Sequence, residues 1–159
     1  MYSFTNGFSG YHQIRIAKED HHKTTFVTEW GCFQYTMMLF GLKNAHVIFF
    51  HVLVATFKDF IQKFLVVYMD DWIVYGLIRD HLANLRLMLE RCRQHQIMLK
   101  SKKCIFCATF GMLLGHIVYK QGMLVDLANI ALILSLSPHT KVQMFRAALG
   151  HTGYYRMFI

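Results

Sequence analysis

The stretch "FLVVYMDDWIVYG", from Phe64 to Gly76, carries the strongest fold signal in this sequence. Ten of its thirteen residues are apolar or aromatic, yet two adjacent carboxylates, Asp70 and Asp71, stand in its middle. Apolar runs on either side of a short polar centre predict two buried strands joined by a turn that holds both acids. Strands that are apolar on both faces are covered by other elements, so the acids are expected at one edge of a packed sheet.

The two acids allow two interpretations. Carboxylates this close together lose water on one side and repel each other, which is unfavourable unless a cation binds. Hard cations such as Mg²⁺ take carboxylate oxygens and leave their other positions to water and substrate phosphate. The alternative is a plain polar turn, because Asp is common in tight turns. Asp70 and Asp71 are therefore either metal ligands or ordinary turn residues.

The sequence around this hairpin alternates between helical and extended patterns. Apolar residues follow helical spacing over 43–63, and a second amphipathic helix is predicted over 79–95. One face of the second helix is predicted to hold Leu82, Leu85, Leu89 and Cys92. The predicted strands are 2–5, 24–28, 32–38, 64–68, 72–75, 105–119 and 123–125. Two further helices are predicted at 127–136 and 142–149, separated by Ser137-Pro138. This order favours an α+β fold, in which an antiparallel sheet carries helices on one face.

Length and composition indicate one domain with a basic surface. The chain has 159 residues, 55% of them apolar, without linkers, repeats or low-complexity tracts, so a single ordered domain over 1–159 is expected. Lys and Arg number 17 against 9 Asp and Glu, which gives a formal charge of +8. A basic, aromatic-rich domain favours a polyanion as its partner, nucleic acid before a membrane surface.

Targeting signals and cysteine usage indicate an intracellular protein. The start, "MYSFTNGF", lacks the basic and long apolar regions of a signal peptide, and the longest apolar runs are too short to cross a bilayer. We therefore expect a cytoplasmic or nuclear protein that is neither secreted nor membrane-inserted. The 4 cysteines are too few for a disulfide framework, so free thiols are expected.

The segment "CIFC", Cys104 to Cys107, has the spacing of half a zinc site, and His116 could add a third ligand. No second Cys-x-x-Cys or His-x-His pair follows it. Ordinary buried cysteines are therefore the preferred interpretation of this segment.

Seven segments, taken in order, resemble the palm of the reverse transcriptase of gypsy-type LTR retrotransposons. They are "FSGYHQI" (8–14), "KTTFVTEWGCFQY" (23–35), "FGLKNA" (40–45), "VYMDD" (67–71), "KKCIF" (102–106), "LLGHIV" (113–118) and "LGHTGYYRMFI" (149–159). The resemblance covers nearly the whole sequence, and it implies a polymerase palm with part of the fingers and the start of the thumb region. It also implies RNA-directed DNA polymerase activity, which copies an RNA or DNA template-primer from dNTPs with two Mg²⁺ ions.

The resemblance assigns roles to individual residues. "YMDD" is similar to the family's catalytic motif, so Asp70 is implied as a metal ligand and Asp71 as its support, with both in the metal site. Tyr11 stands at the steric-gate position, where it would stack under the deoxyribose and exclude a 2′-hydroxyl; from the residues alone, a core tyrosine near a turn is an equal alternative. Phe40 and Gly41 match the nucleotide pocket. The primer grip is matched by Leu114, Gly115 and His116.

Two groups of cations could contact phosphates along the template-primer duplex. They are Lys100, Lys102 and Lys103 in one cluster, and Arg86, Arg91 and Arg93 on the second predicted helix. For any single lysine of the first group, a solvated surface position is the preferred interpretation.

Asn6 departs from the family pattern. The family usually reads Asp-x-x-Ser-Gly-Tyr, whereas this protein has Asn6-Gly7-Phe8-Ser9-Gly10-Tyr11, with an amide at the first catalytic Asp position. An amide has no net charge and cannot bridge two metal ions as a carboxylate does, so polymerase activity is expected to be severely reduced. We also expect Asn6 to lie close to Asp70 and Asp71 in the fold.

The extent of the resemblance predicts a fragment of a larger polyprotein. Most of the fingers, nearly all of the thumb and the RNase H segment are expected to be missing. A non-catalytic nucleic-acid-binding remnant and a non-functional translated fragment of a decayed element are the alternatives to a polymerase palm.

Overall fold

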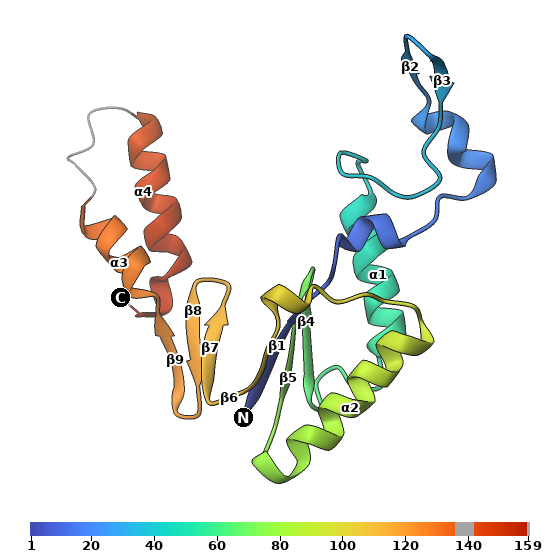
Figure 1. Cartoon of the computed structure of the whole chain (residues 1–159). Coiled ribbons are helices and arrows are strands. Elements are labelled where there is room, and N and C mark those ends of the chain that lie inside the picture. Colours follow the sequence, from blue (N-terminus) through green and yellow to red (C-terminus); the bar gives the residue numbers. More distant parts are fainter. Residues whose placement is uncertain (136–141, 159) are drawn as a thin grey trace. The chain divides into compact units, whose positions relative to one another are not determined.

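The computed structural model describes residues 1–135 and 142–158, and it divides the protein into two compact units, Met1–Ala108 and Thr109–Ile159 (Figure 1). The first unit holds a four-stranded and a two-stranded sheet, the second holds a three-stranded sheet, and each unit has its own helices. The predicted break at Ser137-Pro138 lies outside the described residues, as does the last residue of the helix predicted at 127–136.

A four-stranded antiparallel sheet forms the centre of the first unit. Its strands stand in the order β4-β5-β1-β6, and each neighbouring pair is antiparallel. They are β1 (Tyr2–Asn6), β4 (Leu65–Tyr68), β5 (Asp71–Tyr75) and β6 (Ile105–Ala108). The hairpin predicted around Asp70 is confirmed as β4 and β5. Its turn is shorter than predicted, because Asp71 already belongs to β5 and pairs with Tyr68.

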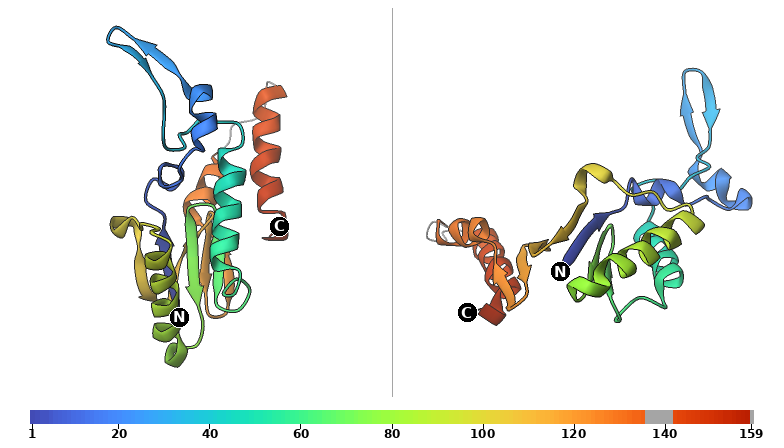
Figure 2. Two further views of the ribbon diagram at one scale, coloured as in Figure 1. Left: turned by 90° about the vertical axis from the view of Figure 1, so that its right-hand side faces the viewer. Right: turned by 60° about the horizontal axis from the view of Figure 1, so that its bottom comes forward.

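Two helices cover one face of this sheet, α1 (Ala45–Phe57) and α2 (Ile78–Gln94) (Figure 2). The buried residues Phe49, Leu53 and Phe57 repeat every four positions along α1, so they share one side of the helix. They join one apolar core with Trp72 and Val74 of β5. Complete burial of side chains of this size contributes about 1.5–3 kcal/mol each, so this face holds the sheet and helices together.

The helix α1 is shorter than the one predicted over 43–63. It ends at Phe57, and the backbone then turns over 58–64 before it enters β4. Gln62 takes a left-handed conformation there, with φ of 68°. The apolar residues Phe60 and Ile61 continue the helical spacing, but they pack against the core from this turn rather than from a helix.

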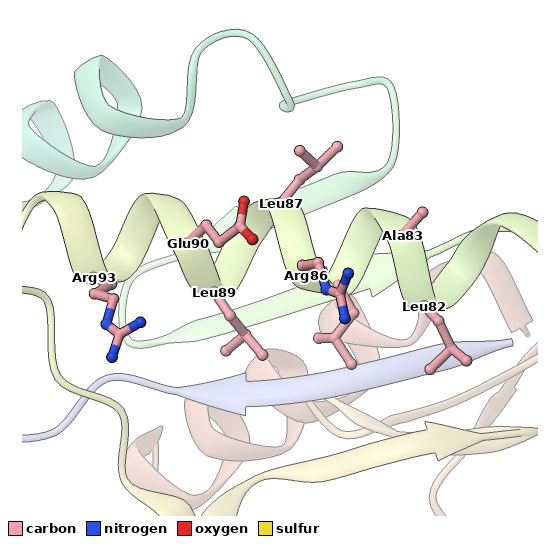
Figure 3. A pocket seen from close by; sticks show the side chains of 8 residues that line it. Leu82, Ala83, Arg86, Leu87, Leu89, Glu90 and Arg93 are labelled. Carbon is pink, nitrogen blue, oxygen red and sulfur yellow. The ribbon is translucent and has the colours of Figure 1, made fainter.

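The face predicted for α2 is confirmed for Leu85 and Cys92 and is wrong for Leu82 and Leu89. Its buried residues are His81, Leu85, Met88 and Cys92. Leu82 and Leu89 are exposed instead and line an open groove along the helix with Arg86 and Arg93 (Figure 3). His81 can be buried because its Nε2 atom lies 2.7 Å from the hydroxyl of Ser3 in β1, within hydrogen-bond distance. This long-range contact is the physical reason for the difference.

Between β1 and α1 lie peripheral elements. Short 3₁₀ helices occupy Gly10–Gln13 and Lys18–Thr24. The predicted hairpin is confirmed with shorter strands, β2 (Phe26–Thr28) and β3 (Gly31–Phe33). The strand residues are exposed apart from a half-buried Thr28, so this hairpin adds little to the core.

The second unit contains a three-stranded antiparallel sheet in the order β7-β8-β9. Its elements are β7 (Phe110–Leu113), β8 (His116–Tyr119), β9 (Gly122–Val125), α3 (Leu127–Leu134) and α4 (Val142–Tyr154). The extended run predicted over 105–119 is therefore three strands in two sheets. Two residues in it depart from an extended backbone and are left-handed, Cys107 within β6 with φ of 56° and Leu114 after β7 with φ of 48°.

The structure describes the state of the cysteines and the lengths of the helices. All four cysteines are free thiols. Cys92 is buried, and burial raises the pKa of its thiol to about 12. Cys104 is half-buried and Cys107 is exposed, so the expectation of ordinary buried cysteines in "CIFC" is wrong for Cys107. Across 1–135 and 142–158, no helix combines the length and the apolar character needed to cross a bilayer.

Candidate catalytic site

The end of β1 meets the tip of the β4-β5 hairpin. The strand register places Asn6 opposite Asp71. The side-chain amide of Asn6 donates from Nδ2 to Oδ1 of Asp71 at 2.8 Å, and the backbone N–H of Gly7 donates to the carbonyl of Asp70, also at 2.8 Å. The structure therefore brings Asn6 against Asp71 and Gly7 against Asp70, although 65 positions separate Asn6 from Asp71.

A buried tryptophan, Trp72, holds the turn that carries Asp70. Met69 takes a left-handed conformation with φ of 47°, which closes the hairpin. Its carbonyl accepts a hydrogen bond from Nε1 of Trp72 at 2.8 Å, and Trp72 is fully buried against Phe57 of α1. The position of the acids is therefore tied to the hydrophobic core.

The electrostatics of the turn favour a cation. Burial raises the pKa of the Asp70 carboxyl above its ordinary value, and the charge of Asp71 raises it further. The ammonium group of Lys103 opposes both effects. Lys103 lies in the 3₁₀ turn Ser101–Lys103, and the preceding Lys100 donates its backbone N–H to the carbonyl of Asn6 at 2.7 Å. Lys103 was predicted only as a possible phosphate contact, and its action on Asp70 was missed.

Gly10 is a second residue that sequence reasoning missed. It is buried, and a Cβ atom at this position would lie 2.5 Å from Cζ of Phe49 and 2.8 Å from Oδ1 of Asp70. Only glycine lets the backbone pass between an aromatic ring and a carboxylate at these distances. A glycine directly before the candidate residue Tyr11 is the sequence signal that could have indicated this close approach.

Tyr11 and Phe40 come together beside Gly10. The Tyr11 ring packs edge-on against Phe40 at 4.8 Å and against Phe49 at 5.4 Å between ring centroids. Tyr11 is half-buried, whereas Phe40 is 61% exposed. Gly41 has φ of +97° and open space around it, so it ends this segment in a conformation that suits glycine.

Two of the predicted primer-grip residues, Leu114 and Gly115, form the turn between β7 and β8 in the second unit, and the third, His116, begins β8. Leu114 and Gly115 are both left-handed, with φ of 48° and 71°. The hydroxyl of Tyr154 donates to the carbonyl of Leu114 at 2.6 Å, and that of Tyr155 donates to the carbonyl of Gly115 at 3.2 Å. Both carbonyls are thus held by the end of α4 and the residue that follows it. These tyrosines were part of the resemblance, but their contact with the turn was not predicted.

Aromatic packing and a further hydrogen bond complete this turn. The His116 ring lies 5.3–5.5 Å from the rings of Tyr154, Tyr155 and Phe158. Asn129 of α3 donates from Nδ2 to the Tyr155 hydroxyl at 2.8 Å. The turn is therefore fixed by side chains from α3 and from the C-terminal part of the unit.

Metal-binding chemistry is present in part. In the described ranges, 1–135 and 142–158, no three His, Cys, Asp or Glu side chains gather as a metal-ligand group, so the zinc interpretation of Cys104, Cys107 and His116 gains no support. The carboxylate oxygens of Asp70 and Asp71 fit a hard cation. Asn6 does not fit as the third ligand in this arrangement, because it turns an N–H donor toward Asp71.

Comparison with known proteins gives consistent matches. The family described as "Reverse transcriptase (RNA-dependent DNA polymerase)" matches residues 1–121. The Pol polyproteins of the transposons 297 and gypsy of Drosophila melanogaster are 34% and 32% identical over 94% and 95% of the sequence. The protein spans only 14% and 15% of their lengths. The foamy viral protease-reverse transcriptase in complex with double-stranded DNA shares the fold with a TM-score of 0.89, at 18% identity over 98% of this protein and 27% of that one.

Proposed function

The chain belongs to the reverse transcriptase family, whose match covers residues 1–121, and from this premise we propose that it carries a palm site for template-directed DNA synthesis from dNTPs. It is similar to a segment of the Pol polyproteins of the transposons 297 and gypsy. The observation that carries the proposal is the contact of Asn6 with Asp71, and of Gly7 with Asp70, at one end of the sheet.

In this proposal Asp70 and Asp71 are the catalytic carboxylates and would hold Mg²⁺. The chemistry supplied by a cation held there is neutralisation of the charge that develops on phosphate oxygens during nucleotidyl transfer. The raised pKa of Asp70 supports this role, because burial and the charge of Asp71 both make an uncompensated carboxylate unfavourable. Gly10 leaves the space that the Asp70 side chain occupies, and Lys103 offsets part of the negative charge.

Tyr11, Phe40 and Gly41 form the proposed dNTP-binding segment. Tyr11 is anchored on Phe49 of the core and packs against the exposed ring of Phe40, an arrangement that suits a rigid aromatic platform under a sugar. A rigid platform would exclude a 2′-hydroxyl by steric contact. Both interpretations of Tyr11 are thus compatible, since one side of the ring packs on the core while the residue remains partly accessible.

The turn of Leu114, Gly115 and His116 is the proposed contact with the primer strand of a template-primer duplex. Its backbone is fixed by the two tyrosine hydroxyls, which suits a surface that must hold a flexible strand in one register. The formal charge of +8 supports a nucleic-acid partner.

Asn6 is proposed to impair catalysis. Its amide carries no charge, and its N–H occupies a carboxylate oxygen of Asp71 that a metal ion would need. Charge stabilisation in such sites is worth several kcal/mol, so the polymerase rate should be about a thousandfold or more below that of a variant with aspartate at position 6.

Primer extension on an RNA template tests this proposal. The purified Asn6→Asp variant should incorporate dNTPs at least about a thousandfold faster than the natural protein in Mg²⁺. Asn44→Asp is the matched control, because it makes the same change at an exposed position before α1 and should leave the rate unchanged. Equal extension by the natural protein and the Asn6→Asp variant would refute the proposed role of residue 6.

A non-catalytic nucleic-acid-binding remnant is the second candidate, and the Asn6–Asp71 hydrogen bond favours it, because this bond satisfies Asp71 without a cation. Such a remnant would bind duplexes with steep salt dependence and little sequence preference. Binding without extension, even in the Asn6→Asp variant, would select this function. A protein that shows neither binding nor a cooperative melt would be a non-functional fragment.

A further inference from the structure

The dipeptide Asn6-Gly7 is chemically distinctive in this protein. Of the four asparagines, at 6, 44, 84 and 129, Asn6 alone precedes a glycine. An asparagine before glycine is especially open to deamidation, because no side chain shields the following backbone nitrogen. The nitrogen of Gly7 attacks Cγ of Asn6 and loses its proton, the bond between Cγ and Nδ2 of Asn6 breaks, and ammonia leaves. Water then breaks one of the two bonds between the imide nitrogen and a carbonyl carbon. Breaking the bond to Cγ gives aspartate, and breaking the bond to the backbone carbonyl carbon gives isoaspartate.

The fold opposes each requirement of this reaction. The attacking nitrogen of Gly7 donates its hydrogen to the carbonyl of Asp70 at 2.8 Å. The amide that must depart donates to Asp71 at 2.8 Å. The carbonyl of Asn6 accepts from the N–H of Lys100 at 2.7 Å, so the peptide unit between Asn6 and Gly7 is held on both sides. Residue 6 is extended within β1, and an extended backbone keeps the next nitrogen away from Cγ.

We propose that Asn6 is a modification site controlled by the fold: the folded protein preserves the amide, whereas the unfolded protein converts it to a carboxylate. The reaction requires that the end of β1 separate from β5 and from the segment at Lys100. Strand ends open by local unfolding, so the folded protein should react at least about tenfold more slowly, which corresponds to about 1.4 kcal/mol of opening free energy.

The two products differ in their consequences. Aspartate would place a third carboxylate opposite Asp71 in the existing register, and this part of the inference rests on the proposed function. Isoaspartate adds one backbone carbon to β1, which shifts the pairing of Gly7 with Asp70 and Leu99 and blocks the same fold from forming.

Peptide mass mapping over time tests the inference. The protein is incubated at mildly alkaline pH in buffer and in concentrated urea, and amide loss is followed in the peptide that contains Asn6. The expected result is fast loss in urea and at least about tenfold slower loss in buffer. Equal rates in the two conditions would overturn the proposal.

A matched variant checks that the reaction uses the Gly7 nitrogen. Gly7→Ala should react more slowly in urea, because its methyl group hinders the attack, and the added Cβ lies 3.4 Å from the Trp72 ring, which the fold tolerates. Loss in urea at the same rate as in the natural protein would contradict this chemistry.

A second measurement separates this inference from the proposed function. Mg²⁺ should raise the Tm of Asn6→Asp more than that of the natural protein, because the third carboxylate increases charge repulsion that a cation relieves. Protection of the amide without this Tm response would uphold the modification site and reject the proposed metal role of residue 6.

Discussion

The end of the first sheet that carries Asn6, Asp70 and Asp71, called the acid end below, and the β7-β8 turn of the second unit differ in what holds their candidate functional groups in place. At the acid end, the strand register brings the side chains of Asn6 and Asp71 together. At the turn, the tyrosine hydroxyls hold the backbone carbonyls of Leu114 and Gly115. A single substitution can therefore change the chemistry of the acid end without changing its fold, whereas the turn depends on distant side chains for its shape.

The largest expected effect on stability is at Gly10, which separates Phe49 from Asp70. Gly10→Ala adds a Cβ atom 2.5 Å from Phe49 and 2.8 Å from Asp70. Overpacking of this kind should lower the free energy of unfolding by about 1–3 kcal/mol in urea denaturation. Gly150→Ala is the control, because its Cβ meets open space within α4, and this variant should be neutral or slightly stabilising. A Gly10→Ala variant as stable as the natural protein would show that the acid end is not tightly packed.

A smaller effect is expected at the turn. Tyr155→Phe removes the hydroxyl that accepts from Asn129 and donates to Gly115, which should cost about 1–2 kcal/mol. Hydrogen exchange of the amides in 113–116 should become faster, since this turn loses its support. Tyr154→Phe should have a weaker effect, because Tyr154 is 55% exposed and water can replace its hydroxyl. If both variants exchange like the natural protein, the hydroxyls do not fix the turn.

The smallest expected effect is a dependence of the protein's stability on pH, which arises from His81 in the first unit. Burial lowers the pKa of His81, and the charged N-terminal amino group lowers it further. The unfolded protein therefore binds the proton more readily than the folded protein. The stability that the protein has with a neutral His81 is complete above the ordinary histidine pKa of 6.5 and is lost as the pH falls through and below it.

Urea denaturation at pH 7.5 and pH 5, two conditions on either side of that pKa, measures this dependence. The natural protein should be less stable at the lower pH. His81→Asn removes the titrating ring and should reduce the difference between the two conditions. An unchanged difference in this variant would assign the pH dependence to other groups.

The local patterns of the sequence predict most elements of the fold, but not which face of a helix is buried or where a helix ends. The apolar runs around Asp70 correctly predict β4 and β5, because both strands are buried and their signal is local. The predicted face of α2 is right for Leu85 and Cys92 but wrong for Leu82 and Leu89. The local pattern does not show the burial of His81, because its partner Ser3 lies 78 positions away. The predicted length of α1 was wrong for a related reason, since Phe60 reaches the core from a turn.

The candidate site shows the same limit. The meeting of Asn6 with the acids was expected only from the resemblance to a family, because no local pattern links positions 65 apart. The contacts of Gly10 with Phe49 and of Lys103 with Asp70 were not predicted, since they depend on how separate segments pack. The metal roles of Asp70 and Asp71 stay predictions.

Gly10 also offers a way to measure how strongly folding alone constrains a position. In a randomised library screened only for soluble expression, position 10 should stay glycine, because every side chain there meets Phe49 and Asp70. Position 6 should accept several polar residues in the same screen, since its side chain is only half-buried. The fraction of variants that survives at each position would therefore measure how strongly folding alone constrains position 10 and position 6.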